Sequence, residues 1–188
     1  MANVNHSTLT DPYLHEPKGV AAASSGEVYV ADGTGSGDWI ASDNHISAHI
    51  PFDAATPAYS HSTTTSDTVL NPTFSIGSSK GFTGLSSPNA RLQYNGANTV
   101  YGLVTFFASV RQASGSDKDI EMSIYKNGTE IAGTRTIRTV SSGTWGVVAF
   151  NTITSLSSND YLEVFVKGDV AHTTEFAGAK MAINCFPG

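Results

Sequence analysis

The sequence has few charged residues, a single cysteine and no long apolar run. Charged residues make up 14% of the 188 residues, and the net charge is −6; soluble domains usually carry about 25% charged residues. An acidic balance argues against nucleic acid as a partner, because phosphate binding requires a basic patch. One cysteine, Cys185, excludes an intramolecular disulfide framework. No apolar run approaches the roughly 20 residues that span a bilayer, so no membrane insertion is expected.

Serine, threonine, glycine and alanine take the place of the missing charge, a composition typical of β-rich extracellular or virion structural proteins. The first 17 residues have neither the basic nor the apolar region of a secretory signal. We therefore expect synthesis and assembly in a cytoplasm.

Strand patterns dominate residues 99–186. Asn127-Gly128 lies between two strand-like runs and favours a type I′ hairpin, because both central residues of that turn need positive φ. The clearest other strand-like runs cover residues 99–110, 144–156, 160–167 and 173–186, with weaker ones at 73–76 and 90–94. The sequence therefore predicts an all-β fold, an antiparallel sandwich.

Two of these strands are apolar on both faces. In residues 99–110, Tyr101, Leu103 and Phe107 lie opposite a second apolar set that comprises Val100, Val104, Phe106, Ala108 and Val110. In residues 160–167, Tyr161 and Phe165 alternate with the apolar set Leu162, Val164 and Val166. A sheet with one wet face would alternate apolar with polar residues. No amphipathic helix is available as a cover, so we expect the second apolar face to be a subunit interface.

The first third of the chain carries the whole net charge. Residues 1–65 hold one lysine against seven acidic residues, whereas residues 66–188 hold nine of each sign. This part has a short strand pattern at 27–30, a glycine-rich stretch at 32–38 and then Trp39-Ile40, too little to bury a core. We expect residues 1–57 to form an extended acidic arm that becomes ordered on another protein. Residues 58–188 would then form the sandwich domain.

No motif predicts catalysis, a cofactor or a metal site. Gly33–Gly37 lacks the lysine and the following helix of a phosphate loop. His45 and His49 have metal-ligand spacing only if their segment is helical, and are compatible with a structural metal or with ordinary arm or interface histidines. Asp117, Asp119 and Glu121 lie close together in sequence and would either bind calcium or remain solvated charge at a strand edge, the commoner outcome.

The strand after the hairpin has an uneven register. Ile131, Gly133, Arg135 and Ile137 share one face, which places an arginine in phase with apolar residues. Either a bulge near Gly133 corrects the register, or the strand leaves the core there.

The runs 124–130 (IYKNGTE) and 158–164 (SNDYLEV), followed by an apolar last strand, resemble the jelly roll of the tumour necrosis factor/complement-type family. The resemblance covers roughly residues 66–186 and implies a jelly-roll sandwich that forms a homotrimer. It also implies that outward-facing aromatic residues line the trimer axis; here these would be Tyr101, Phe107, Tyr161 and Phe165.

Residues 11–20 (DPYLHEPKGV) and 26–33 (GEVYVADG) look like the N-terminus of tailed-phage virion proteins. These are capsid decoration (cement) or head-fibre proteins, in which an arm attaches to the shell and a jelly roll projects. The resemblance implies that the arm binds the major capsid protein on the capsid exterior, through Tyr13, Leu14, Val28, Tyr29 and Trp39.

Together, the two resemblances lead to the hypothesis that the chain is a trimeric capsid decoration protein. It would stabilise contacts between capsomers and would not be an enzyme. The alternative is the receptor-binding tip of a phage tail or head fibre, which would bind a host-surface receptor. That alternative requires exposed aromatic residues in loops, of which Phe82 is the best candidate. A third reading, a glycan hydrolase, requires paired carboxylates, for which Glu121, Glu163 and Asp169 are the candidates.

Overall fold

The computed structural model describes residues 24, 27–31, 37–41, 44–50, 59–72, 75–76, 81–85 and 89–187. The chain divides into two units, Met1–Asp43 and Asn44–Gly188. Regular structure in the described residues consists of strands and turns. A search of the same residues finds no helix suited to crossing a membrane.

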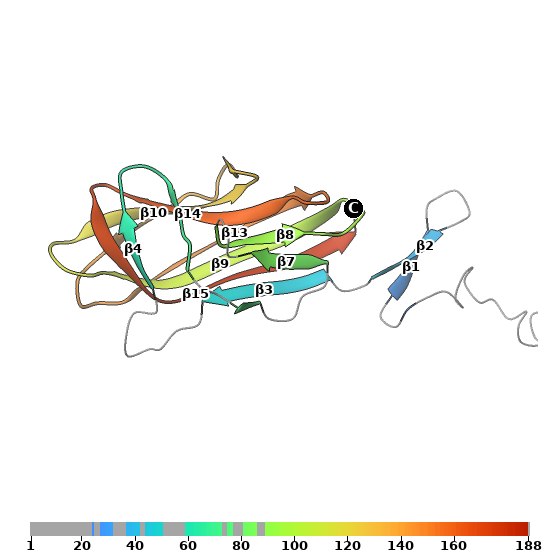
Figure 1. Cartoon of the computed structure of the whole chain (residues 1–188), viewed down its shortest axis with the longest axis horizontal. Coiled ribbons are helices and arrows are strands. Elements are labelled where there is room, and N and C mark those ends of the chain that lie inside the picture. Colours follow the sequence, from blue (N-terminus) through green and yellow to red (C-terminus); the bar gives the residue numbers. More distant parts are fainter. Residues whose placement is uncertain are drawn as a thin grey trace, which may run out of the picture. The chain divides into compact units, whose positions relative to one another are not determined.

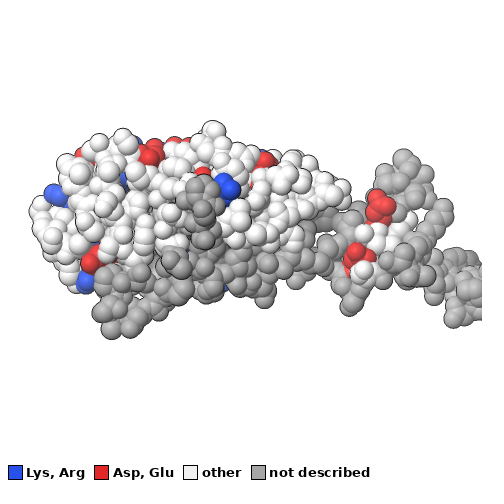
Figure 2. Space-filling view, viewed as in Figure 1, with Lys and Arg blue, Asp and Glu red and all other residues white. Residues whose placement is uncertain are grey.

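The first unit contains the antiparallel pair β1 (Glu27–Ala31) and β2 (Gly37–Ala41). β1 matches the strand pattern predicted at residues 27–30, whereas β2 was not predicted as a strand. Two described acidic residues lie on them, Glu27 and Asp38, and acidic side chains are visible on this unit in Figure 2. Tyr13 and Leu14, predicted as arm contacts, lie outside the described residues.

The second unit consists of two antiparallel sheets, visible as two layers in Figure 1. The β9 sheet has the order β13-β9-β15-β3-β6, and β4 also pairs with β15. The β14 sheet has the order β11-β10-β14-β8-β7, with β12 on β10 and β5 on β14. The strands of the β9 sheet are β3 (Asn44–Ile50), β4 (Tyr59–Thr63), β6 (Ser75–Ile76), β9 (Val100–Gln112), β13 (Gly146–Leu156) and β15 (His172–Pro187). Those of the β14 sheet are β5 (Thr68–Val69), β7 (Phe82–Leu85), β8 (Arg91–Tyr94), β10 (Lys118–Lys126), β11 (Thr129–Glu130), β12 (Thr136–Val140) and β14 (Tyr161–Gly168).

The order of the strands is that of a jelly roll. From β8 to β9 to β10, and again from β12 through β13 and β14 to β15, the chain changes sheet at every step. Such alternation winds a double-layered antiparallel sandwich of the jelly-roll type. The predicted fold class, an all-β antiparallel jelly-roll sandwich, is therefore confirmed.

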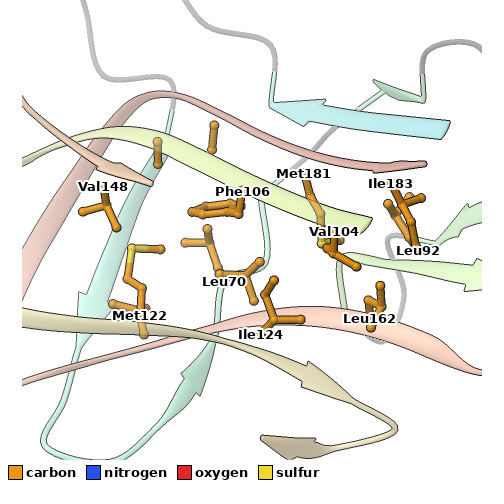
Figure 3. Close-up of a cluster of buried hydrophobic side chains, with 14 of the residues drawn as sticks. Leu70, Leu92, Val104, Phe106, Met122, Ile124, Val148, Leu162, Met181 and Ile183 are labelled. Atoms are coloured by element: carbon orange, nitrogen blue, oxygen red, sulfur yellow. The ribbon is translucent and has the colours of Figure 1, made fainter. Parts of the chain in front are cut away.

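The core lies between the two sheets. Along β9 every second residue, beginning at Val100, is buried, and along β14 Leu162, Val164 and Val166 are buried, as their alternation predicts. Figure 3 shows side chains of the two layers pointing toward one another, among them Phe106 of β9 and Ile124 of β10. The two-layer packing explains why these strands are apolar on their inner faces.

The Asn127-Gly128 turn has the predicted conformation. Its φ angles are 52° and 76°, and Lys126 pairs with Thr129 across it. The Asn127 side chain also ties this hairpin to the turn before β14: its Nδ2 donates to Asp160 Oδ1 at 2.6 Å. Its Oδ1 accepts from the amide of Tyr161 at 3.0 Å. Local sequence therefore specifies both the turn and its attachment.

The boundary between the units lies earlier than predicted. Residues 44–50, assigned to the arm, form β3, which pairs with β15 in the sandwich. The sandwich unit thus begins at Asn44 rather than residue 58. The helical premise for His45 and His49 is also wrong, because both lie in β3. A four-residue step along a strand spans about 13 Å, which removes the helical metal-site geometry.

Of the two explanations for the uneven register after the hairpin, the structure supports the one in which the chain leaves the core near Gly133. Gly133 has φ of 81° and lies in a turn between β11 and β12, so the chain leaves the sheet instead of forming a bulge. Thr134 is buried and its hydroxyl donates to the carbonyl of Ile131 at 2.8 Å. Ile137 then lies on an exposed face of β12, and Arg135 meets carboxylates described below.

Candidate interaction surfaces

The outer face of the β9 sheet carries large apolar residues that are exposed in the described part of the chain. We define the β9 outer face by five residues on adjacent strands, Tyr101, Leu103 and Phe107 of β9 with Val147 and Ile153 of β13. Leu103 pairs directly with Ile153. Tyr101, Phe107, Val147 and Ile153 are between 50% and 70% exposed. Thr105 and Asn151 lie between the Leu103–Ile153 pair and Phe107 on the same face. Several large apolar side chains exposed together on one sheet face typically mark a contact with another protein.

Charged and aromatic groups border this face at one end. Arg111 Nε lies 2.6 Å from Glu175 Oε2, and the Arg111 guanidinium lies 4.5 Å from the centre of the Trp145 ring. Lys180 of β15 pairs in register with Phe107. An apolar centre with a polar rim is the usual composition of a protein interface.

The four aromatic residues predicted at a trimer axis do not share one surface. Tyr101 and Phe107 lie on the β9 outer face, whereas Tyr161 and Phe165 lie on β14, on the outer side of the other sheet. Arg91 lies 4.6 Å over the Tyr161 ring, and Tyr125 stacks on Phe165 at 3.9 Å between ring centroids. The second pair therefore already has neighbours within the chain.

Val147 and Ile153 were missed by the sequence analysis. Their signal was the alternation within β13, where they share a face with Ala149. Their exposure could not be predicted from the sequence. It depends on β13 pairing with β9 and on the absence of any other described segment over that side of the sheet.

Two of the three acidic residues considered either as a calcium site or as solvated strand-edge charge, Asp119 and Glu121, have partners within the chain. Glu121 Oε2 lies 3.1 Å from both Arg135 Nη1 and Lys167 Nζ. Asp119 Oδ1 accepts from the Thr139 hydroxyl at 2.6 Å. A search of the described residues finds no group of three His, Cys, Asp or Glu that could hold a metal ion.

Arg135 is the centre of a charge cluster on the outer side of the β14 sheet, formed with Asp67, Glu121 and Glu130. Its Nη1 and Nη2 donate to the two Asp67 carboxylate oxygens at 3.0 and 3.1 Å. The hydrogen bonds that Arg135 donates are the main cause that lowers the pKa of Asp67. The bonds to Glu130, and then those to Asp67 and Glu121, raise the pKa of Arg135. We assign this cluster to stability, since it joins the segment before β5 to β10, β11 and the turn before β12.

The remaining residues considered for catalysis or receptor binding are hydrogen-bonded within the chain or buried. The buried Glu163 accepts from Asn89 Nδ2 at 3.2 Å, and Asp169 accepts from the Asp119 and Val170 amides. Phe82 was expected in an exposed loop, which is wrong: it lies in β7 and packs on Tyr94 with ring centroids 5.1 Å apart.

Cys185 is buried in β15, in phase with the buried Met181 and Ile183 of the same strand. Burial raises the pKa of its thiol to about 11. The thiol is therefore protonated at neutral pH and unreactive.

The first unit presents an aromatic pair. Tyr29 of β1 pairs in register with Trp39 of β2, and their rings meet edge to face with centroids 5.5 Å apart. Val28 pairs with Ile40 in the next register position. A two-stranded hairpin is marginally stable by itself in water, so a unit of this kind is suited to binding another protein.

The similarities to known proteins are confined to structures. No protein-family model and no curated protein matches the sequence. Eiger TNF from S. frugiperda aligns over 76% of this chain and 93% of its own, at 10% identity and a TM-score of 0.45. Murine APRIL at pH 8.0 aligns over 76% and 99%, at 12% identity and a TM-score of 0.46. Murine APRIL at pH 8.5 aligns over 74% and 98%, at 13% identity and a TM-score of 0.44. These likenesses concern the fold alone.

Proposed function

We propose that the chain is a virion structural protein, a homotrimeric capsid decoration (cement) protein that binds the major capsid protein on the capsid exterior. The sandwich would assemble through the β9 outer face and stabilise contacts between capsomers. The first unit would attach to the shell. Binding would rest on burial of apolar area and not on catalysis.

The β9 outer face is the observation that carries this proposal. Its apolar side chains are costly to leave in water, and copies of the chain arranged around a three-fold axis would bury them against one another. The separate first unit supports the attachment role, because its cross-strand aromatic pair has the residue types that dominate binding energy at interfaces. A trimer would present three such units at once, so weak individual contacts give tight overall attachment.

Replacing Ile153 with aspartate is expected to convert the trimer into monomers. The carboxylate would have to be buried without a partner, which we expect to weaken association by about 100-fold or more. Sedimentation or light scattering gives the mass directly. Ile137→Asp is the matched control, because Ile137 is also highly exposed, at 65% against 70% for Ile153, but lies on β12 of the other sheet. A monomeric native chain, or an Ile153→Asp variant that remains trimeric, would contradict the assembly.

Replacing Trp39 with alanine is expected to weaken binding to undecorated shells of the parent virus by about tenfold or more, while the trimer mass stays unchanged. Co-sedimentation with shells measures the binding. Tyr161→Ala is the control for loss of a partly exposed aromatic residue, since Tyr161 lies in the sandwich unit beneath Arg91, on the sheet opposite the β9 outer face. Equal binding by the native and Trp39→Ala proteins would argue against attachment through this pair.

The receptor-binding tip remains the second candidate, although the burial of Phe82 removes the loop aromatic that favoured it. The copy number in purified virions separates the two roles. A number near that of the major capsid protein supports decoration, whereas a few copies per particle support a fibre or vertex protein.

A further inference from the structure

Residues 59–72 fasten the two sheets to each other, and we call them the β4–β5 strap. β4 pairs with β15 in the β9 sheet, and β5 pairs with β14 in the β14 sheet. The amide of Leu70 donates to the carbonyl of Val164 at 2.7 Å, and the Leu70 side chain is buried in the core. Figure 1 shows β4 and the segment after it, in teal, crossing between the layers at one end of the sandwich.

A buried histidine holds the two arms of the strap together. The His61 side chain of β4 lies between Tyr59 and Thr68, with Nδ1 3.1 Å from the Tyr59 hydroxyl and Nε2 2.8 Å from Thr68 Oγ1. Thr68 Oγ1 donates its proton to the carbonyl of Val166 at 2.9 Å. It must therefore accept from His61, which fixes the Nε2–H tautomer and leaves Nδ1 as the acceptor for the Tyr59 proton.

A second proton on His61 would break the hydrogen bond that the Tyr59 hydroxyl donates to Nδ1. The Tyr59 oxygen would then have to accept from Nδ1 as well as from the amide of Asn71 at 3.4 Å, and its own proton would turn away from the imidazole. The Tyr59 proton would then lose its acceptor, and a positive charge would lie in a buried position. Both changes cost free energy in the closed strap and are relieved when His61 reaches water.

The ionisable residues on the surrounding elements do not offset that charge. They are Tyr59 on β4, Asp67 before β5, Lys167 on β14, and His172 and Glu175 on β15. Asp67 pairs with Arg135, Lys167 with Glu121, and Glu175 with Arg111. His172 bonds to Thr174 and to the carbonyl of Val170. Within the described chain, none of the four on neighbouring elements contacts His61 through a hydrogen bond or ion pair.

We propose that protonation of His61 releases the β4–β5 strap, so that the sandwich opens at this end in acid. Burial lowers the pKa of His61, so the neutral form is the one that the fold favours. The unfolded strap binds the extra proton more readily, so stability of the closed strap is full above the ordinary histidine pKa, about 6.5. It falls as the pH drops below that value. Opening would expose the buried Leu70 and one end of the core.

Hydrogen exchange of the full chain, at about pH 7.5 and about pH 5 with correction for intrinsic rates, tests this inference. We expect peptides from residues 59–72 to exchange about tenfold faster at the lower pH relative to peptides from β9. Asp67 stays ionised at about pH 5, because its pKa lies below its ordinary value of 3.8. Its pairing with Arg135 is therefore not the acid-sensitive contact in this window.

Two variants identify the group responsible. His61→Gln keeps a donor and an acceptor but does not titrate, and is expected to lose the acid response. His172→Gln removes the neighbouring histidine on β15 and is expected to keep it. A strap equally protected at both pH values, an unchanged acid response in His61→Gln, or equal loss of protection in β9 would each overturn the proposal.

Nuclear magnetic resonance of the imidazole nitrogens provides a test that needs no variant. We expect His61 to remain the neutral Nε2–H tautomer until the strap amides lose protection, with both changes at the same pH. A His61 ring that becomes charged while those amides stay protected would also overturn the proposal.

Discussion

Replacing Phe176 with alanine is expected to lower the free energy of unfolding by about 4 kcal/mol. Among the described residues, Phe176 is the largest fully buried side chain, and it lies where β15 pairs with both β4 and β9. Its ring packs on Tyr59 of the strap with centroids 5.9 Å apart. Truncation would leave a cavity there, because a close-packed core relaxes only partly around a removed ring.

Chemical denaturation at one fixed protein concentration measures this loss. Phe176→Leu is the control, because it retains most of the apolar volume and is expected to cost about 1.5 kcal/mol or less. Equal losses in the two variants would show that ring stacking, and not cavity volume, determines the effect. A loss below about 1 kcal/mol for alanine would mean that the site collapses fully.

Replacing Arg135 with methionine is expected to lower the free energy of unfolding by about 2 kcal/mol at neutral pH. The guanidinium binds Asp67, Glu121 and Glu130, and all four side chains are only partly buried. Without it, the three carboxylates repel one another, and in the described part of the chain Lys167 is left to pair with Glu121 and to act on Asp67 at longer range. Urea denaturation measures the difference in free energy of unfolding. The expected loss is modest because water screens these partly exposed ion pairs.

The same variant has a defined pH dependence. Arg135 lowers the pKa of Asp67 in the folded chain, so the stability due to this pair is present above the unfolded pKa, near 3.8. It is lost as the pH falls through the lower folded pKa. The native chain and Arg135→Met should therefore converge in stability below about pH 4. Arg138→Met is the control: Arg138 is exposed on β12 and forms no ion pair within the described chain, so a change below about 0.5 kcal/mol is expected. A gap that stays constant down to about pH 2 would rule out the carboxylates as the cause.

Several features follow from residues that are neighbours in sequence. Asn127-Gly128 forms its hairpin because these two residues tolerate positive φ at low cost. The inner face of β9 and the burial of Cys185 follow from alternation with a period of two residues. In each case the physical cause acts within a few residues, so a linear reading is sufficient.

Other features depend on residues that only the fold brings together. Arg135 looked misplaced in its strand, yet its partner Asp67 lies 68 residues earlier and reaches it through the strap. His45 and His49 have helical spacing, but pairing with β15 places them in a strand. Long-range pairing overrides local spacing because each strand satisfies its backbone hydrogen bonds on its neighbour.

The sequence by itself determined the all-β class, the hairpin at Asn127-Gly128, the inner faces of the long strands and the acidic first third of the chain. Only the tertiary structure decided that Tyr101 and Phe107 share a surface with Val147 and Ile153 while Tyr161 and Phe165 lie on the other sheet. It also decided that His61 closes a strap between the sheets. Alternation tells which residues share a face of one strand, but which strands pair, and what covers each face, depends on contacts between distant segments.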